Sequence, residues 1–199
     1  MNEEERRREL SYLETLTTAQ SRQNIEDGRV VYQKQNLVFP PFLYHSTEQI
    51  TQTPQESRGI ILSTKQQADD KTFFIAQYMQ VIGTGDAVSV FVDPQKRQAM
   101  MELIRRHPEL KTTEFHCHTN QTGSAWEQKF SPGDYNTILK MRQKNPDYTH
   151  ALFTPTHILT NGREKTSFVL ARQDTDQTSQ IETYQSFDEE YRDILARMK

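Results

Sequence analysis

The chain has 199 residues, a hydrophobic content of 34%, a mean hydropathy of −0.86 and a formal net charge of −3. This length fits one domain with an extension, and the polar balance predicts long solvated segments around a modest core. There is no basic surplus to suggest nucleic acid or a membrane as a partner, and Cys117, the only cysteine, excludes an internal disulfide.

Residues 1–35 are predicted to form a helical N-terminal extension, because Leu10, Leu13 and Leu16 recur at helical spacing in a highly charged stretch. This helix either docks a partner or packs as a solvated helix on its own domain. The charged N-terminus has no apolar run behind it, so no signal peptide is expected. The chain is predicted to be cytoplasmic, although secretion as an effector is not excluded.

Residues 36–199 are predicted to form one α/β domain. Residues 30–44 look extended and stopped by Pro40 and Pro41. Apolar, β-branched runs then predict strands over 54–62, 73–81 and 87–92, with a turn at 83–86. Asp93 and Pro94 mark the start of a helix, since Asp caps helices and Pro suits the first helical position.

The second half alternates in the same way, which favours a mixed β-sheet flanked by helices. Strands are predicted over 112–118, 151–159 and 166–171, a helix over 132–144, and a two-residue hairpin at Asn161-Gly162. A terminal amphipathic helix is predicted to begin at Ser186, with Glu189 completing a capping box. Its apolar face comprises Phe187, Tyr191, Ile194, Leu195 and Met198.

His116 and His118 are the first candidate site residues. Alternate side chains of a strand share a face, so both imidazoles would point the same way, and Cys117 would point the other. Two imidazoles and one carboxylate around one ion, with a fourth position open, are typical of a catalytic zinc site. An H-x-H pair alone is weak evidence, and two unrelated histidines would give the same pattern. No partner at a recognisable spacing is found for His107, His150 or His157.

Ser131 and Asp134 supply the next candidate pair. Ser131-Pro132-Gly133-Asp134 is an ordinary helix start, with Ser131 as the N-cap and Asp134 completing a capping box. Alternatively, Asp134 turns toward the metal and the Ser131 hydroxyl donates to a forming oxyanion. A general base is also needed. Glu56 and Glu114 are both candidates, and Glu114 lies on the same strand face as the two histidines.

The order of these pieces resembles the JAMM metalloprotease family, which is built on the MPN domain. Its signature is a Glu ahead of a Gly-aliphatic strand, then H-x-H, then S-x-x-D, and it matches Glu56, Gly59-Ile60-Ile61-Leu62, His116-Cys117-His118 and Ser131-Pro132-Gly133-Asp134.

The resemblance implies a cytidine-deaminase-like sandwich and a zinc-dependent hydrolase that cleaves isopeptide or peptide bonds, often in ubiquitin or ubiquitin-like conjugates. It implies His116, His118 and Asp134 as Zn²⁺ ligands. It also implies Glu56 as general base and acid and Ser131 as the residue that steadies the tetrahedral intermediate. Glu114 then becomes a group that orients an imidazole, or a solvated carboxylate.

Three departures from the family pattern stand out. Thr119 replaces the usual Pro after the second His, and Ser63-Thr64 replaces the Gly that closes the aliphatic strand. Twelve residues separate His118 from Ser131, more than the family usually has, so residues 119–130 must loop out. Trp126, within this segment, is either a packing anchor or a substrate contact. The alternative function is a non-catalytic MPN-like scaffold that binds partners through its terminal helices.

Overall fold

The computed structural model describes residues 36–68, 71–86, 89–119, 130–154, 158–161, 166–168 and 177–198. The expected N-terminal extension, residues 1–35, and Trp126 lie outside these ranges. The described helices are α2 (Pro41–Gln52), α3 (Pro94–Arg106), α4 (Pro132–Lys144) and α5 (Thr178–Arg197). The described strands are β1 (Asn36–Val38), β2 (Glu56–Ala68), β3 (Lys71–Gly85), β4 (Val90–Val92), β5 (Lys111–Cys117), β6 (His150–Phe153), β7 (Ile158–Asn161) and β8 (Thr166–Phe168).

These strands form one mixed sheet in the order β1-β3-β2-β5-β6-β7-β8, and β4 also pairs with β3. Two pairings position the candidate site. β5 joins β2 in antiparallel fashion and sets His116 opposite Arg58, and β6 joins β5 in parallel and sets His150 opposite Glu114. The α/β class with a mixed sheet, predicted from the sequence, is confirmed.

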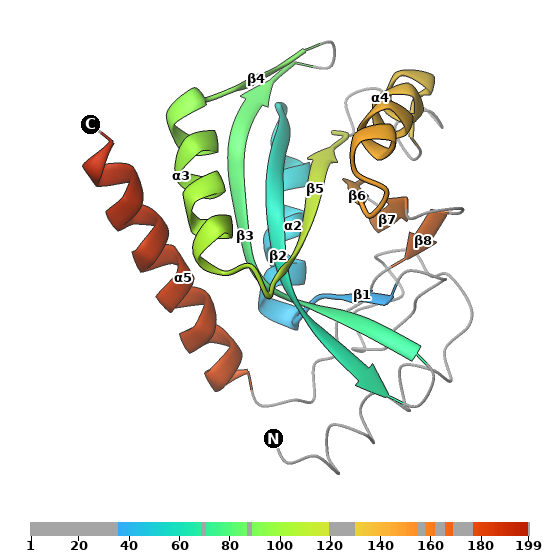
Figure 1. The fold of residues 1–199 in the computed structure, drawn as a ribbon. Helices are drawn as coiled ribbons and strands as arrows, with labels where there is room; N and C mark the ends of the chain where they lie inside the picture. The colour runs from blue at the N-terminus through green and yellow to red at the C-terminus, as the bar shows by residue number, and fades with distance from the viewer. Residues whose placement is uncertain are drawn as a thin grey trace.

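The alternation of strand side chains divides the core between the two faces of the sheet. Phe115, Cys117 and Phe153 belong to the cluster that includes α2. The opposite face carries α3 and α5 over β2 and β3, and α4 over β5 and β6. Figure 1 shows α3 and α5 side by side along β3, and α4 beyond the ends of β5 and β6. Ile60 and Leu62 of β2 therefore pack against α3 and α5, and Leu152 of β6 packs against α4.

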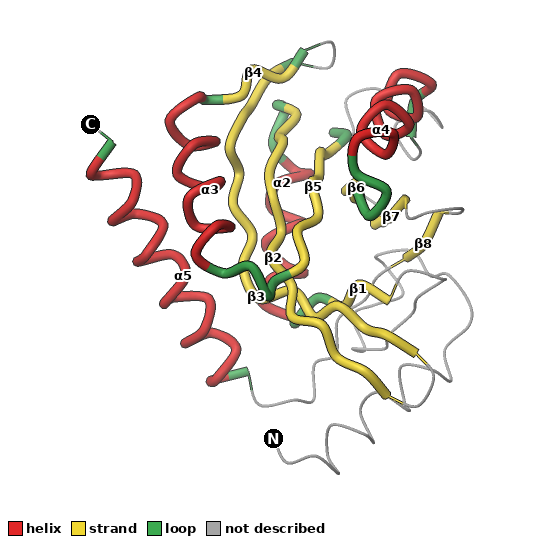
Figure 2. Tube along the Cα trace, viewed as in Figure 1, coloured by secondary structure: helices red, strands yellow, loops and turns green. Residues whose placement is uncertain are grey.

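Local capping signals placed two helices correctly. The Asp93 carboxylate caps α3 by accepting from the backbone N–H groups of Gln95 and Lys96. Ser131 caps α4, and both helices have proline in the first turn, where its missing N–H costs nothing. The predicted bounds of 132–144 for α4 match the structure. Figure 2 marks these helices against the strands that lead into them.

One helix was not predicted, and another begins earlier than predicted. The extended segment does stop at the prolines, since β1 ends at Val38, but residues 41–44 belong to α2, because Pro41 stands at a permitted first position and Leu43, Tyr44 and Thr47 are buried behind it. α5 begins at Thr178, eight residues before the predicted cap at Ser186. Its first turns are polar, but Tyr184 packs on Tyr78 with ring centroids 5.1 Å apart, so tertiary contact extends the helix.

The strand predictions differ from the structure in three places. The segment predicted as one strand over 151–159 is split into β6 and β7, which pair antiparallel with Phe153 opposite Ile158. β7 and β8 pair Asn161 with Thr166, so Asn161-Gly162 is not a two-residue hairpin. β3 extends through Gly85, where a turn was expected from residue 83, because Gly83 and Gly85 pair with β4.

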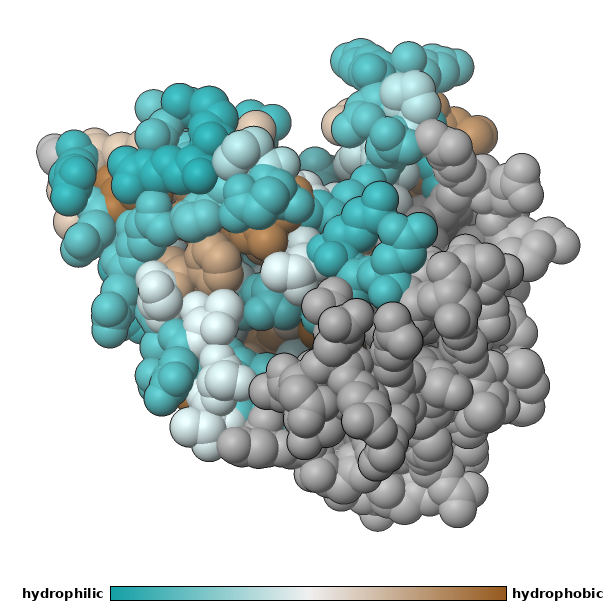
Figure 3. Space-filling view, turned by 60° about the horizontal axis from the view of Figure 1, so that its bottom comes forward, coloured by the Kyte–Doolittle hydropathy of each residue, from teal (hydrophilic) through white to brown (hydrophobic). Residues whose placement is uncertain are grey.

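Polar side chains cover most of the described surface in the view of Figure 3, with apolar surface confined to small areas between them. The apolar face of α5 is used within the chain, since Tyr191 and Ile194 are buried in the cluster formed with α3 and the sheet. Among the described helices, none combines the length and the apolar character that crossing a bilayer requires.

Candidate metal centre

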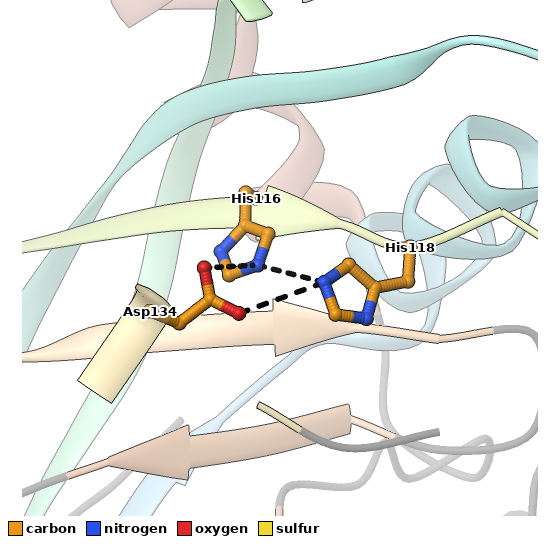
Figure 4. A group of neighbouring side chains, drawn as sticks. All are labelled: His116, His118 and Asp134. Atoms are coloured by element: carbon orange, nitrogen blue, oxygen red, sulfur yellow. Dashed lines mark hydrogen bonds and ion pairs between the residues drawn. The ribbon is translucent and has the colours of Figure 1, made fainter. Parts of the chain in front are cut away.

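Three side chains converge at the end of β5. His116 lies on β5, His118 follows its last residue, and Asp134 comes from the first turn of α4 (Figure 4). The Nε2 atoms of the two histidines are 3.1 Å apart. Asp134 places Oδ1 3.3 Å from Nε2 of His116 and Oδ2 3.7 Å from Nε2 of His118. The three predicted ligands are therefore brought together, and the group could hold a metal ion.

The spacing of these atoms fits a small coordination sphere. Metal–ligand distances of 2.0–2.2 Å in a tetrahedral site place the ligand atoms about 3.3 Å from one another. The measured separations lie around this value. The side chains of His116, His118 and Asp134 are 12%, 13% and 23% exposed, so they are largely shielded yet still open to solvent on one side.

Asp134 serves the helix cap and the cluster at the same time. Its Oδ2 accepts the backbone N–H of Ser131 at 2.7 Å, and its own N–H donates to Oγ of Ser131 at 3.2 Å. From the sequence, the Asp134 carboxylate could either cap the helix or turn toward the two histidines. In the structure it caps the helix and also faces both imidazoles. The Ser131 oxygen accepts from the N–H of Asp134, and the Ser131 hydroxyl also helps to lower the pKa of the Asp134 carboxyl group.

The pKa values of Asp134 and Glu56 are shifted in opposite directions. Burial alone would raise the pKa of Asp134, but hydrogen bonding and attraction to His116, together with hydrogen bonds from Ser131, hold it well below its usual range. Glu56, at the start of β2, is half-buried, and burial raises the pKa of its carboxyl group. His116 opposes this increase, whereas Asp134 and Asp86 add to it, so Glu56 feels the charges of the cluster.

Glu114 is engaged elsewhere. Its Oε2 accepts from Nη2 of Arg58 at 2.8 Å and from the hydroxyl of Tyr148 at 3.0 Å. Arg58 and Tyr148 therefore occupy this oxygen of Glu114. Glu56, the other acid that the sequence left open, has a pKa that is influenced by the charges of His116 and Asp134.

His150, for which the sequence offered no partner, is in contact with the cluster. Its Nε2 lies 2.7 Å from Nδ1 of His116, and its Nδ1 lies 2.9 Å from the Tyr148 hydroxyl. Burial, helped by the charges of His116 and Arg58, lowers the pKa of His150 well below its ordinary value. No spacing rule could reveal this contact, because parallel pairing of β6 with β5 creates it across 34 residues.

Phe130 closes the cluster from the α4 side. Its ring centroid is 6.1 Å from those of His116 and His150, and its side chain is 3% exposed. Thr119 is also buried, so the chain leaves the site at Thr119 and returns to it at Phe130. The segment between them, residues 120–129, lies outside the described residues, yet Asp134 reaches the two imidazoles despite the added length.

Cys117 faces away from the cluster, as its place between the two histidines predicts. It is fully buried in the α2-side core, and its Sγ accepts the backbone N–H of Ser57 at 2.9 Å. Burial raises the pKa of its thiol to about 11, which keeps it protonated and a poor nucleophile at neutral pH.

No known protein-family model matches the chain, and no curated protein matches it either. What it does must therefore be inferred from the chemistry of these side chains.

Proposed function

We propose that this protein is a zinc-dependent hydrolase of the JAMM type, with an MPN-like fold, that cleaves an isopeptide or peptide bond. A ubiquitin or ubiquitin-like conjugate is the proposed substrate class. One observation carries the proposal: two imidazole nitrogens and one carboxylate converge at separations of 3.1, 3.3 and 3.7 Å beside an acid of raised pKa.

His116, His118 and Asp134 would hold the ion. Two imidazoles and one carboxylate suit zinc, and three protein ligands leave a coordination position open for reaction. Bound there, zinc would supply Lewis acidity, lowering the pKa of a coordinated water and polarising a carbonyl.

Glu56 is assigned the proton transfers. A carboxylate whose pKa lies above its usual value is a better proton acceptor, and once protonated it can pass the proton to the leaving nitrogen, which is much more basic. Continuing the β2–β5 register two residues beyond the Arg58–His116 pair brings Glu56 opposite His118. Glu114 is not assigned this role, because its acceptor oxygen is shared by Arg58 and Tyr148.

Ser131 is assigned to the oxyanion. Its oxygen accepts from the N–H of Asp134, and its hydroxyl would rotate to donate where negative charge develops. The bond that breaks is the substrate C–N bond, the oxygen added comes from water, and the proton removed from that water reaches the departing amine through Glu56.

Metal content and turnover test the proposal together. We expect one equivalent of zinc per chain by elemental analysis, and cleavage of at least one member of a panel of ubiquitin-like conjugates that stops on adding a chelator. The same donor set also occurs in non-haem iron(II) enzymes, so stoichiometric iron in place of zinc would contradict the assignment.

Glu56→Gln separates catalysis from metal binding. Glutamine keeps the shape of the side chain but cannot accept a proton, so turnover should fall by about 10²–10⁴-fold with zinc content unchanged. Wild-type turnover in Glu56→Gln would disprove the role of Glu56. Zinc binding without turnover of any conjugate would favour the non-catalytic scaffold instead.

A further inference from the structure

A chain of hydrogen bonds runs behind His116, away from the cluster. Nδ1 of His116 contacts Nε2 of His150 at 2.7 Å, and Nδ1 of His150 contacts the Tyr148 hydroxyl at 2.9 Å. That hydroxyl donates to Oε2 of Glu114, which also accepts from Arg58. His150 and Tyr148 are 5% and 7% exposed, so the middle of this chain is shielded from water.

The direction of every proton in this chain follows from its end. The arginine only donates and the carboxylate only accepts, so the single O–H of Tyr148 is committed to Glu114. The Tyr148 oxygen must then accept from Nδ1–H of His150. A neutral imidazole carries one N–H, so Nε2 of His150 is an acceptor and the donor facing it is Nδ1–H of His116.

We propose that His150 and Tyr148 are positioning residues that keep a proton on Nδ1 of His116, so that Nε2 is the ring nitrogen that faces His118 and Asp134. This inference about the tautomer needs no metal. Its consequence for zinc affinity rests on the proposed function, because Nε2 is the atom that would ligate the ion. Partners of this kind orient ligating imidazoles, and losing one typically weakens metal binding 10–100-fold.

The tautomer can be measured directly on the metal-free full chain by ¹⁵N NMR of the imidazole nitrogens. We expect Nδ1 of His116 to have a protonated-type shift, and His150 to be protonated at Nδ1 and unprotonated at Nε2. An unprotonated-type shift at Nδ1 of His116 would overturn the inference whether or not the protein binds zinc.

Tyr148→Phe tests whether the chain controls the ligand. Removing the hydroxyl leaves Nδ1–H of His150 without an acceptor, so His150 should shift toward the other tautomer and release His116 from its own. We expect a mixed tautomer signal at His116 and a zinc Kd raised at least about tenfold, measured by competition with a chromogenic chelator.

Tyr78→Phe is the matched control. The Tyr78 side chain is fully buried and its hydroxyl is also hydrogen-bonded to a carboxylate, that of Asp188, but it lies between the sheet and α5. It should alter neither the tautomer nor the zinc Kd. Equal zinc Kd values for Tyr148→Phe and wild type would overturn the role of Tyr148. A wild type that has the expected tautomer yet binds no zinc would refute the proposed function alone.

Discussion

Ser131 performs two tasks with different atoms of one hydroxyl. Its oxygen accepts the N–H of Asp134 and caps α4, while its hydrogen is the proposed oxyanion donor. Ser131→Ala should lower the free energy of unfolding by about 1 kcal/mol. Ser131→Gly should lower it by only a few tenths of a kcal/mol, because glycine is tolerated at the N-cap. Both variants lack the donor, so both should lose about 10²–10³-fold in turnover.

Denaturant melts and turnover on the same preparations separate these effects. If the losses in turnover followed the losses in stability, with Ser131→Gly close to wild type, the hydroxyl would serve the cap alone. Parallel losses in turnover at unequal stabilities would fit both tasks.

At the level of single residues, the sequence located those site members that follow local rules. His116 and His118 share a face because strand side chains alternate, and Asp134 follows from the S-x-x-D helix start. His150 and Tyr148 were missed, since they meet His116 only through the pairing of β6 with β5. Tertiary pairing of this kind leaves no spacing signal in the chain.

Among the elements, β2 depends on a glycine at its contact with β5. A Cβ added at Gly59 would lie 2.2 Å from the carbonyl oxygen of Gln80 and 2.4 Å from ring carbons of Phe115. Backbone and a buried ring cannot move aside cheaply, so Gly59→Ala should destabilise the protein by about 1–3 kcal/mol. It should also disturb the pairing of Arg58 with His116.

Gly133→Ala is the matched substitution on α4. The added Cβ would lie 3.6 Å from Oγ of Ser131, an ordinary contact, and alanine favours the helix by up to about 1 kcal/mol. Urea unfolding of both variants measures the contrast. Equal stabilities of Gly59→Ala and Gly133→Ala would show that β2 and β5 are not in close contact at Gly59.

Glu190 ties α5 to the end of α3. Its carboxylate lies 2.8 Å from Nε2 of His107 and 3.1 Å from Nη1 of Arg106. Burial is the largest single effect and would raise the pKa of Glu190, but the hydrogen bonds and charges of His107 and Arg106 together outweigh it and lower the pKa below its usual 4.5. A folded-state pKa below the unfolded value means that the contribution to stability is complete above pH 4.5 and is lost as the pH falls through the folded-state pKa.

Glu190→Gln should therefore lower Tm by about 1–3 °C at pH 7, and this difference should shrink below pH 4.5. Glu109→Gln is the control. Glu109 also faces His107, but its side chain is 66% exposed and its carboxylate lies 3.5 Å from Nδ1 of His107, a longer contact than that of Glu190. A difference from wild type that grew on acidification would contradict the sign of the linkage.

How far the elements could be predicted depended on whether their signals were local. The starts of α3 and α4 follow from Asp93-Pro94 and Ser131-Pro132, because a cap is read within a few residues. The first turns of α5 were missed, since they are polar and are tied down by distant contacts, such as the Gln177 side-chain oxygen accepting from the N–H of Phe42. The antiparallel return between β6 and β7 was missed because both strands are apolar and read as one run.

For the whole molecule, the cluster joins parts of the chain that the sheet alone does not hold together. His116 lies on β5 and His118 directly follows it, while Asp134 lies on α4, beyond a connection of twelve residues between His118 and Ser131. An ion bound by all three would link α4 to the sheet. Without an ion, only hydrogen bonds and the attraction between Asp134 and the imidazoles join α4 to the end of β5, and coordination of all three groups to one cation would strengthen that link.

Zinc should therefore raise the thermal stability of the whole chain. At a free concentration 100 times Kd, binding to the folded state alone contributes about 2.7 kcal/mol, or about 5–10 °C in Tm for a domain of this size. Differential scanning calorimetry of protein stripped with chelator, with and without zinc, measures the shift. His118→Ala should lose most of the shift, because it removes one ligand. His107→Ala, a histidine at the α3–α5 contact, should keep the full zinc shift. If His107→Ala lost the shift while His118→Ala retained it, zinc would be acting at the wrong end of the molecule, and the cluster at the end of β5 would not be the metal site.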